Sequence, residues 1–403
     1  MSGYLSEMRT HWRPLLAAFI GMSSGMSVVG TITSTIVPSL LQDTHWERAE
    51  FAKIGALSIF MAVVFPFIGR LTDLLGVRKT ALIGQISLPV IYLAYSRMSG
   101  EAISAYKIIF IIQSLLCVTT TATVYSRLAV QYIEKARGLA LAFVVSGPAL
   151  TGMVIGPLLN GYVESQGWRA AYVAMAIFAA IAGLVTFLLI PASSNPVKTA
   201  GQPKRRARED YPMIFRTPAF WFLFGAMLLC NLPQTLLLVQ LKFLMEANGV
   251  GGKEVAVMLS AAPFGMLAGR FAAGFALDRF APYIVAFITL ALPSLGLYVI
   301  ASSYDAPAVL TFAVFCVGFA FGAEGDILAF LVARQFGVTI YSSVMGLLTA
   351  VTAISTATGA WLLGKTMESS GGSFDLFLMI SGTAVLLGAT LLLLLGRVNP
   401  SPA

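Results

Sequence analysis

The 403-residue sequence has little charge and few of the side chains that ligate metals. Only 11% of its residues are charged, whereas a soluble domain carries about 25%. It contains two histidines, His11 and His45, too far apart for a metal site, and its three cysteines lie in apolar runs without a disulfide or metal pattern. These shortages exclude a soluble globular enzyme, a disordered chain and a nucleic-acid-binding protein, and we expect neither a metal nor a cofactor.

Hydrophobic residues make up 58% of the chain, and its mean hydropathy is +0.84. A membrane helix needs about 20 apolar residues, whereas a barrel strand has about 10 of alternating polarity. The runs here are long and apolar on all sides, so the sequence predicts an all-α membrane protein with twelve transmembrane helices. The predicted spans are 14–41, 50–69, 78–97, 103–126, 138–162, 169–191, 218–244, 254–277, 282–302, 307–333, 343–364 and 374–396.

Segment 192–217 is a long polar stretch that contains prolines and a basic cluster at 204–208, which predicts a flexible linker. It separates an N-terminal half of six helices at 1–191 from a C-terminal half of six helices at 218–403. Lysine and arginine are more frequent on the side of the membrane that includes this linker, so that side is predicted to be cytoplasmic. We therefore expect a multi-pass protein of the cell inner membrane with both termini cytoplasmic and its basic cluster in contact with membrane lipid.

A motif at the end of the second span recurs at the end of the eighth. Gly69 and Asp73 form Gly-x-x-x-Asp, and Gly274 and Asp278 repeat it at the same place in the second half. Two six-helix halves related by a repeat are a transporter architecture, with a substrate site near the membrane midplane. The acidic side chain can face the positive N-terminal end of a neighbouring helix, and the basic residues at 78–79 can anchor to the interface.

Residues 69–79 resemble the signature loop of the major facilitator superfamily, whose pattern is Gly-x-x-x-Asp-x-x-Gly-x-Arg-Arg/Lys. The resemblance implies two six-helix halves that alternate between states, with the loop and its second copy acting as a conformational latch. The predicted latch residues are Gly69, Asp73, Gly76, Arg78, Gly274 and Asp278. The alternative is that these residues serve only as topology anchors.

Three ionisable residues lie near the middle of predicted spans, where each costs at least roughly 2.5–3.5 kcal/mol. They are Arg270 in the eighth span and Glu324 and Asp326 in the tenth. A guanidinium offers a planar, bidentate match to a carboxylate, so Arg270 is the predicted binding group for an organic anion. One of the two acids would pair with Arg270 in the empty site and load a proton; a fixed pair that only joins two helices is the alternative.

Residues 268–274 resemble the eighth span of the monocarboxylate-transporter branch of the superfamily, to which oxalate-formate exchangers are related. The resemblance implies that Arg270 binds the substrate carboxylate. The chain departs from the branch at Met266, where animal members have an acid, and its first span has no lysine. Lys365 lies at the outer end of the eleventh span, so one basic residue remains at the centre, which favours a monoanion.

Four further polar residues are predicted to bind the substrate. Large polar side chains need partners in a dry helix bundle, which singles out Tyr125 in the fourth span and Asn231 and Gln234 in the seventh. Thr121 belongs to a run of threonines in the fourth span, although such a hydroxyl also bonds to its own helix.

These features predict a secondary active transporter, not an enzyme, that moves a small organic monocarboxylate anion in symport with a proton by alternating access. Proton coupling is assigned to Glu324 or Asp326, without a choice between them. The alternative is a proton-coupled drug or sugar antiporter of the same fold, in which the acids bind the substrate and Arg270 pairs with them. The sequence has no nucleotide-binding loop, which excludes ATP-driven transport by this chain, and we expect a monomer.

Overall fold

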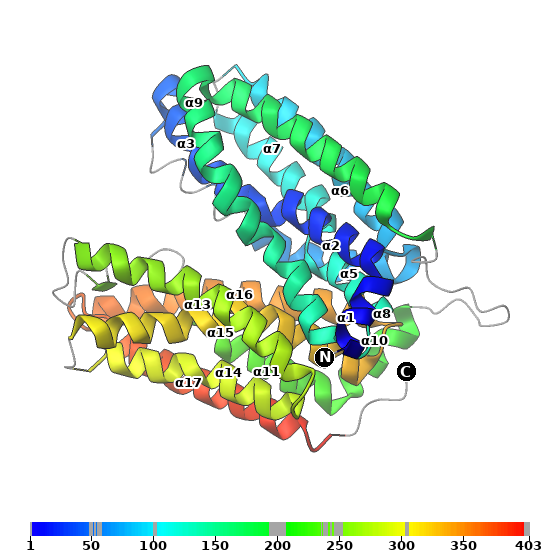
Figure 1. Ribbon diagram of the computed structural model, residues 1–403. Helices are drawn as coiled ribbons and strands as arrows, with labels where there is room; N and C mark the ends of the chain where they lie inside the picture. The colour runs from blue at the N-terminus through cyan, green and yellow to red at the C-terminus, as the bar shows by residue number, and fades with distance from the viewer. Residues whose placement is uncertain are drawn as a thin grey trace. The chain divides into compact units, whose positions relative to one another are not determined.

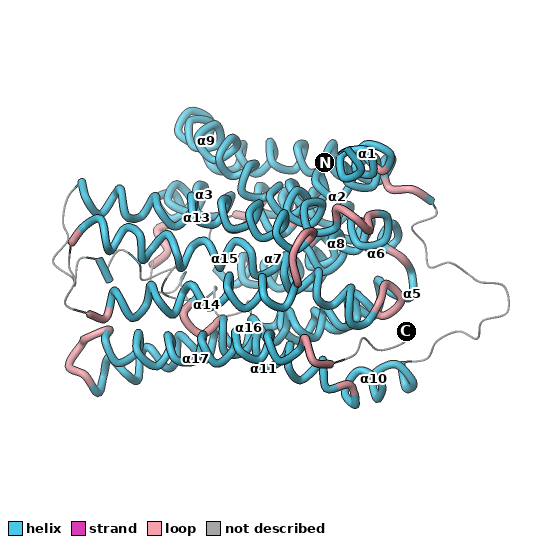
Figure 2. The backbone as a smooth tube through the Cα atoms, turned by 60° about the horizontal axis from the view of Figure 1, so that its bottom comes forward, coloured by secondary structure: helices cyan, strands magenta, loops and turns pink. Residues whose placement is uncertain are grey.

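The computed structural model of the protein describes residues 2–47, 51, 54, 59–99, 103–192, 207–234, 236, 241, 244–245, 253–302 and 306–398. This part of the chain consists of helices joined by loops, and Figure 2 shows no strand in it. The predicted all-α fold class is confirmed.

The helices are labelled in Figure 1. Those of the first half of the sequence are α1 (Ser2–Thr10), α2 (Trp12–Ser24), the 3-10 helix η1 (Met26–Val28), α3 (Val29–Thr44), α5 (Ile59–Leu75), α6 (Val77–Ser96), α7 (Ile103–Leu116), the 3-10 helix η3 (Cys117–Thr120), α8 (Ala122–Tyr132) and α9 (Arg137–Leu189). Those of the second half are α10 (Ala207–Arg216), α11 (Pro218–Cys230), α13 (Lys253–Leu277), α14 (Pro282–Ile300), α15 (Pro307–Phe336), α16 (Tyr341–Ser369) and α17 (Asp375–Leu395).

Six helical segments in the described part of the chain are long and apolar enough to cross a membrane, and up to eight when two bent helix pairs each count as one span. One of the six is α9, which Gly167 divides in two with a φ of 81°, a backbone conformation that favours glycine. The predicted fifth and sixth spans meet at this residue. Parts of the predicted second and seventh spans lie outside the described residues.

The predicted linker is partly helical. Its residues 193–206, with most of the basic cluster, lie outside the described residues, but α10 forms directly after them. Glu209 and Asp210 in its first turn and Arg216 in its last turn complement the helix dipole, a signal that the prolines and basic residues of the segment obscured. The chain bends by 72° where α10 meets α11.

Contacts divide the chain into two compact units. Unit 1 comprises Met1–Lys135, Phe143–Lys204 and Val338–Ala350, and unit 2 comprises Ala136–Ala142, Arg205–Gly337 and Val351–Ala403. Each unit therefore contains a short segment from the other half of the sequence. These segments are the start of α9, which belongs to unit 2, and the start of α16, which belongs to unit 1.

In unit 2, α15 packs against both α13 and α14, and α17 packs against α14 and α11 (Figure 1). Helices within lipid associate mainly through close van der Waals contact, which small residues allow. Gly265 and Gly269 of α13 lie against the backbone of α15, and Gly318 and Gly322 of α15 lie against the backbone of α13. The two backbones touch along this seam, which fixes the positions of the side chains on either side of it.

In unit 1, two membrane segments are broken at points that contact each other. The first segment bends by 41° at Gly25, between α2 and η1, and the other leaves helical geometry at Thr121, between η3 and α8. The backbone N–H of Met26 donates to Oγ1 of Thr120 at 2.9 Å. A broken helix inside a membrane leaves backbone groups without partners, and here a side-chain hydroxyl supplies one for the N–H of Met26.

Asp43, which follows the predicted first span, joins two other segments of unit 1. Its Oδ2 accepts hydrogen bonds from Nε1 of Trp168 at 2.9 Å and from Nη1 of Arg169 at 2.7 Å. The hydrogen bond from Trp168, followed by that from Arg169, holds the pKa of Asp43 below its usual value. This cluster ties the end of α3 to the turn at Gly167.

Replacement of Gly269 by valine is expected to lower the free energy of unfolding by about 1–3 kcal/mol, because the new side chain would push against the backbone of Phe319. Gly364→Ala in α16 is the control, since nothing lies within 4 Å of the added methyl group. Thermal unfolding of the purified protein in detergent measures both variants. Wild-type stability in Gly269→Val would contradict the close contact of α13 and α15.

Candidate functional site

Arg270 and Asp326 form an ion pair inside unit 2. Nη1 of Arg270 lies 3.9 Å from Oδ1 of Asp326, and the two side chains are 14% and 0% exposed. Among the described residues, neither this Nη1 nor either carboxylate oxygen of Asp326 has a hydrogen-bond partner. The pair is therefore held by charge at a distance beyond hydrogen-bond range, and the guanidinium keeps a donor for another acceptor.

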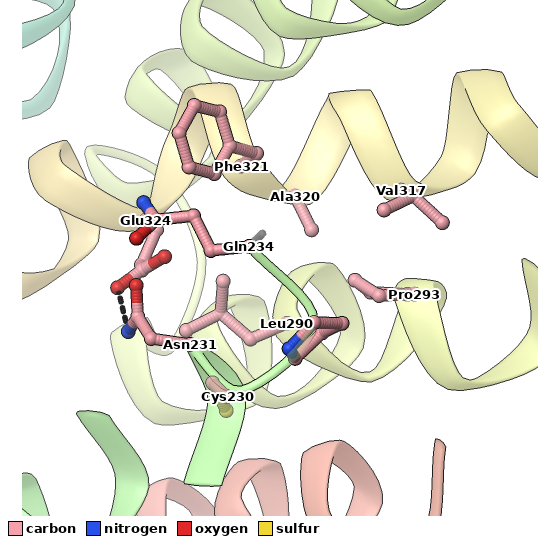
Figure 3. Close-up of a pocket in the computed structure, with 10 residues that line it drawn as sticks. Cys230, Asn231, Gln234, Leu290, Pro293, Val317, Ala320, Phe321 and Glu324 are labelled. Atoms are coloured by element: carbon pink, nitrogen blue, oxygen red, sulfur yellow. Dashed lines mark hydrogen bonds between the residues drawn. The ribbon is translucent and has the colours of Figure 1, made fainter. Parts of the chain in front are cut away.

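Glu324 points away from this pair, because residues two positions apart on a helix point in nearly opposite directions. Its Oε1 accepts a hydrogen bond of 2.5 Å from Nδ2 of Asn231, which also donates to the carbonyl of Met227 at 2.9 Å. Figure 3 shows Glu324 and Asn231 facing each other beside Gln234. The structure thus brings three predicted site residues together on the side of α15 that faces away from Arg270.

These three residues line a cavity of about 20 Å³ within unit 2 (Figure 3). That volume holds about one water molecule. The lining consists of Cys230, Asn231, Pro233, Gln234, Leu290, Pro293, Val317, Ala320, Phe321 and Glu324. It includes one carboxylate and two amides but neither lysine nor arginine.

The cavity adjoins the point where the seventh span is broken, after α11 ends. Side chains of α16 bind the chain at this break. Oγ of Ser355 donates to the carbonyl of Leu228 at 2.5 Å, and Oγ1 of Thr356 donates to Oε1 of Gln234. These bonds supply partners that a broken helix otherwise lacks within a membrane.

Tyr125 and Thr121 belong to unit 1, whereas the cavity belongs to unit 2. Tyr125 is fully buried, and its hydroxyl accepts a hydrogen bond of 2.8 Å from Nε2 of Gln85. Thr121 donates to the carbonyl of Val118 at 2.7 Å. Both side chains have partners within their own unit, and their contact with a substrate stays a prediction.

The side chain of Asp73, a residue of α5, lies beside the N-terminus of α16, within unit 1. Its carboxylate accepts hydrogen bonds from the backbone N–H groups of Ser342 at 3.1 Å and Ser343 at 2.7 Å. Gly69 packs against the carbonyl of Ser342, where a side chain would not fit. An aspartate at a helix N-terminus satisfies unpaired N–H groups and complements the helix dipole, which is the contact that the motif suggested.

Asp278 makes the equivalent contact in unit 2. It accepts hydrogen bonds from the backbone N–H groups of Gly138 at 2.7 Å and Leu139 at 3.0 Å, at the start of α9. Gly274 packs against the backbone of Gly138. The two copies of the motif therefore bind helix N-termini in the same way, although the second lacks the basic pair.

Two other motif residues shape the turn between α5 and α6. Gly76 has a φ of 80°, which favours glycine, and the guanidinium of Arg78 lies 4.4 Å from the ring centre of Phe187. Whether these six motif residues act as a latch stays a prediction.

Arg127 is the residue of this region that the motif did not include. It is 5% exposed, and its Nη1 donates to Oδ1 of Asp73 and, at 3.2 Å, to Oγ of Ser342. A signal existed in the sequence, because arginines end both the fourth and the tenth predicted spans, at Arg127 and Arg334. Position alone could not show that one of them pairs with Asp73.

The family model described as the Major Facilitator Superfamily matches residues 15–360. This match covers most of the chain. The chain belongs to the major facilitator superfamily. It is therefore a multi-pass membrane protein of a transporter family, whereas its place in the monocarboxylate branch stays a prediction.

Solved superfamily structures share the whole fold at low sequence identity. The E. coli fucose:proton symporter FucP has a TM-score of 0.73 at 13% identity, with 97% of this chain and 98% of that chain covered. The human organic anion transporter MFSD10 has a TM-score of 0.72 at 16% identity, with 95% of this chain and 99% of that chain covered. The proton:xylose symporter XylE has a TM-score of 0.74 at 12% identity, with 96% of this chain and 95% of that chain covered. Identities this low establish the fold alone.

A curated relative matches a shorter segment. The protein named putative glycerol-3-phosphate transporter 5 of Arabidopsis thaliana is 27% identical over 139 residues, which are 32% of this chain and 28% of that protein. The match spans under a third of either protein.

Replacement of Asp73 by alanine is expected to lower the free energy of unfolding by about 3–5 kcal/mol, because it leaves the buried charge of Arg127 without its partner. Lys79→Gln is the control, since Lys79 is exposed in the first turn of α6, close to Asp73 in the sequence. Chemical or thermal unfolding in detergent measures the difference. Equal losses of unfolding free energy in the two variants would show that the buried Asp73–Arg127 pair does not stabilise the protein.

Proposed function

We propose that this protein is a secondary active transporter that carries a small organic monocarboxylate in symport with protons, by alternating access. The observation that carries the proposal is the Arg270–Asp326 pair. Arg270 is nearly buried, has a counter-charge at 3.9 Å, and has an Nη1 without a hydrogen-bond partner among the described residues. A fixed structural pair would be expected to close into hydrogen bonds, because an unsatisfied buried donor is costly.

A substrate carboxylate fits this arrangement. The guanidinium presents several N–H donors in one plane, which match two carboxylate oxygens, and it stays charged in a membrane. Asp326 neutralises the charge of Arg270 while the site is empty, and an arriving monoanion takes over that role. One arginine at one centre supports a substrate with one negative charge.

Organic phosphates are a second candidate class. The name of the Arabidopsis relative supports them, and a guanidinium binds phosphate as well as carboxylate. A sugar or drug antiporter of the same fold leaves Arg270 with only Asp326 as an anionic partner, so the pair supports that alternative less.

We further propose that the halves on either side of 192–217 are the moving parts, with both termini on the cytoplasmic side of the inner membrane. The two Asp-capped helix starts support this division. The start of α16, a helix of the second half, belongs to unit 1, where Asp73 caps it. The start of α9, a helix of the first half, belongs to unit 2, where Asp278 caps it.

Uptake into proteoliposomes tests the function. With an inward proton gradient, we expect labelled short-chain or aromatic monocarboxylates to accumulate, and neutral sugars to be excluded. Arg270→Gln should lower uptake about 10- to 100-fold, from roughly 1.5–3 kcal/mol for a hydrogen bond to a charged group. Uptake by Arg270→Lys should lie between that of the wild type and that of Arg270→Gln, because lysine keeps the charge but lacks the planar donors.

Arg279→Gln is the matched control, because Arg279 is an exposed arginine that follows the same helix and lies over Phe275. Unchanged uptake in both Arg270 variants would refute the anion site. Uptake of glycerol 3-phosphate but of no carboxylate, abolished by Arg270→Gln, would keep the anion site and replace the substrate class.

A further inference from the structure

We propose that Glu324, and not Asp326, is the residue that takes up and releases the coupled proton, and that Asn231 is its positioning residue. This inference rests on the proposed proton-coupled function and assigns the two acids different tasks. Asp326 remains the permanent counter-charge of Arg270.

Asp326 is poorly placed to exchange protons. Its side chain is 0% exposed, and its charged neighbour is Arg270 at 3.9 Å. Protonation of Asp326 in the empty site would leave the guanidinium as an uncompensated charge within the membrane, which is strongly unfavourable. Its burial also denies it contact with water. The geometry therefore assigns Asp326 the task of counter-charge to Arg270.

Glu324 has the opposite surroundings. The described lining of the cavity surrounds it with uncharged groups: Cys230, Asn231, Pro233 and Gln234 from the α11 side, Leu290 and Pro293 from α14, and Val317, Ala320 and Phe321 from α15 itself. The nearest titratable group in this lining is the thiol of Cys230, and Arg270 lies on the other side of α15. Among the described residues that line the cavity no cation compensates this carboxylate, so a proton is the natural neutralising partner.

The cavity has room for one step of a proton relay at Glu324, which is half-buried. Its volume of about 20 Å³ suits a single water molecule, which could bond to Glu324, Asn231 and Gln234. A proton from bulk water reaches a carboxylate oxygen of Glu324 through this water and leaves by the same kind of step in the other conformational state. No bond to the substrate forms, and no other group is oxidised or reduced.

Asn231 connects the charge of Glu324 to the backbone. Its amide donates both to Oε1 of Glu324 and to the carbonyl of Met227, at the end of α11. An ionised carboxylate only accepts hydrogen bonds, whereas a protonated carboxyl also donates one. Protonation therefore changes which hydrogen bonds Asn231 can make at the break of the seventh span. This gives the proton a mechanical effect on a discontinuous helix, the kind of element at which transporters bind ligands.

Two transport modes distinguish the acids. Gradient-driven uptake requires a proton to be bound and released in each cycle, whereas exchange of labelled for unlabelled substrate requires only that the loaded carrier change state. We expect Glu324→Gln, which mimics the protonated acid, to lose gradient-driven uptake and to retain exchange. Asp326→Asn should impair both modes, because it removes the counter-charge of Arg270. Glu368→Gln, an exposed acid of α16, is the control for reconstitution.

Asn231→Ala tests the positioning role. It should shift the pH at which gradient-driven uptake is half-maximal, an effect that a merely structural role would not produce. An unchanged pH profile in a folded Asn231→Ala protein would overturn this part of the proposal. Gradient-driven uptake that persists in Glu324→Gln would overturn the assignment of the proton site.

Infrared difference spectroscopy across a pH jump tests the proton site without any substrate. The wild-type protein should show the carbonyl stretch of a newly protonated carboxyl, Glu324→Gln should lose it, and Asp326→Asn should keep it. The reverse pattern, or no such band in the wild type, would overturn the inference. If Glu324→Gln does not fold, Glu324→Asp should keep the band at a shifted frequency. A wild-type protein that transports no carboxylate would refute the proposed function alone, because the infrared result still identifies the titrating acid.

Discussion

The interior of a membrane offers no water to hydrogen bond with, so each polar group there must find its partner within the protein. This constraint explains the architecture better than apolar packing does. At the break after α11, Ser355 donates to the carbonyl of Leu228 and Thr356 to the side chain of Gln234. At the break between α2 and η1, Thr120 accepts from the backbone N–H of Met26. At these two breaks in the described part of the chain, another segment brings a hydroxyl to the backbone.

The glycine seam between α13 and α15 has a second effect beyond holding two helices together. Arg270 directly follows Gly269, and Asp326 lies one turn after Gly322, so the seam determines how closely the two charges approach. Larger residues at these glycines would separate the backbones and with them the pair. The chemistry of the site thus depends on residues that have no side chains of their own.

Much of the fold follows from the sequence because apolar runs of membrane length have few other solutions. The signature loop led to the correct contact of Asp73 with a helix start, since charge and helix dipole are local properties. The opposite directions of Glu324 and Asp326 followed from helix geometry. What the sequence could not supply was the partner of each side chain: that Asn231 reaches Glu324, or that Arg127 reaches Asp73, depends on how separate helices pack. The helix α10 was missed because prolines and basic residues outweighed its favourable terminal charges.

The exchange of short segments between the units has a consequence for how the protein is made. The N-terminus of a chain leaves the ribosome first, but unit 1 includes Val338–Ala350. The backbone N–H groups of this segment donate to Asp73, and its Ser342 hydroxyl accepts from Arg127. Until synthesis passes that point, an inserted first half carries a buried acid and base with an unfinished set of hydrogen bonds. These contacts are supplied by a helix of the second half, so completion of the first half waits for the second.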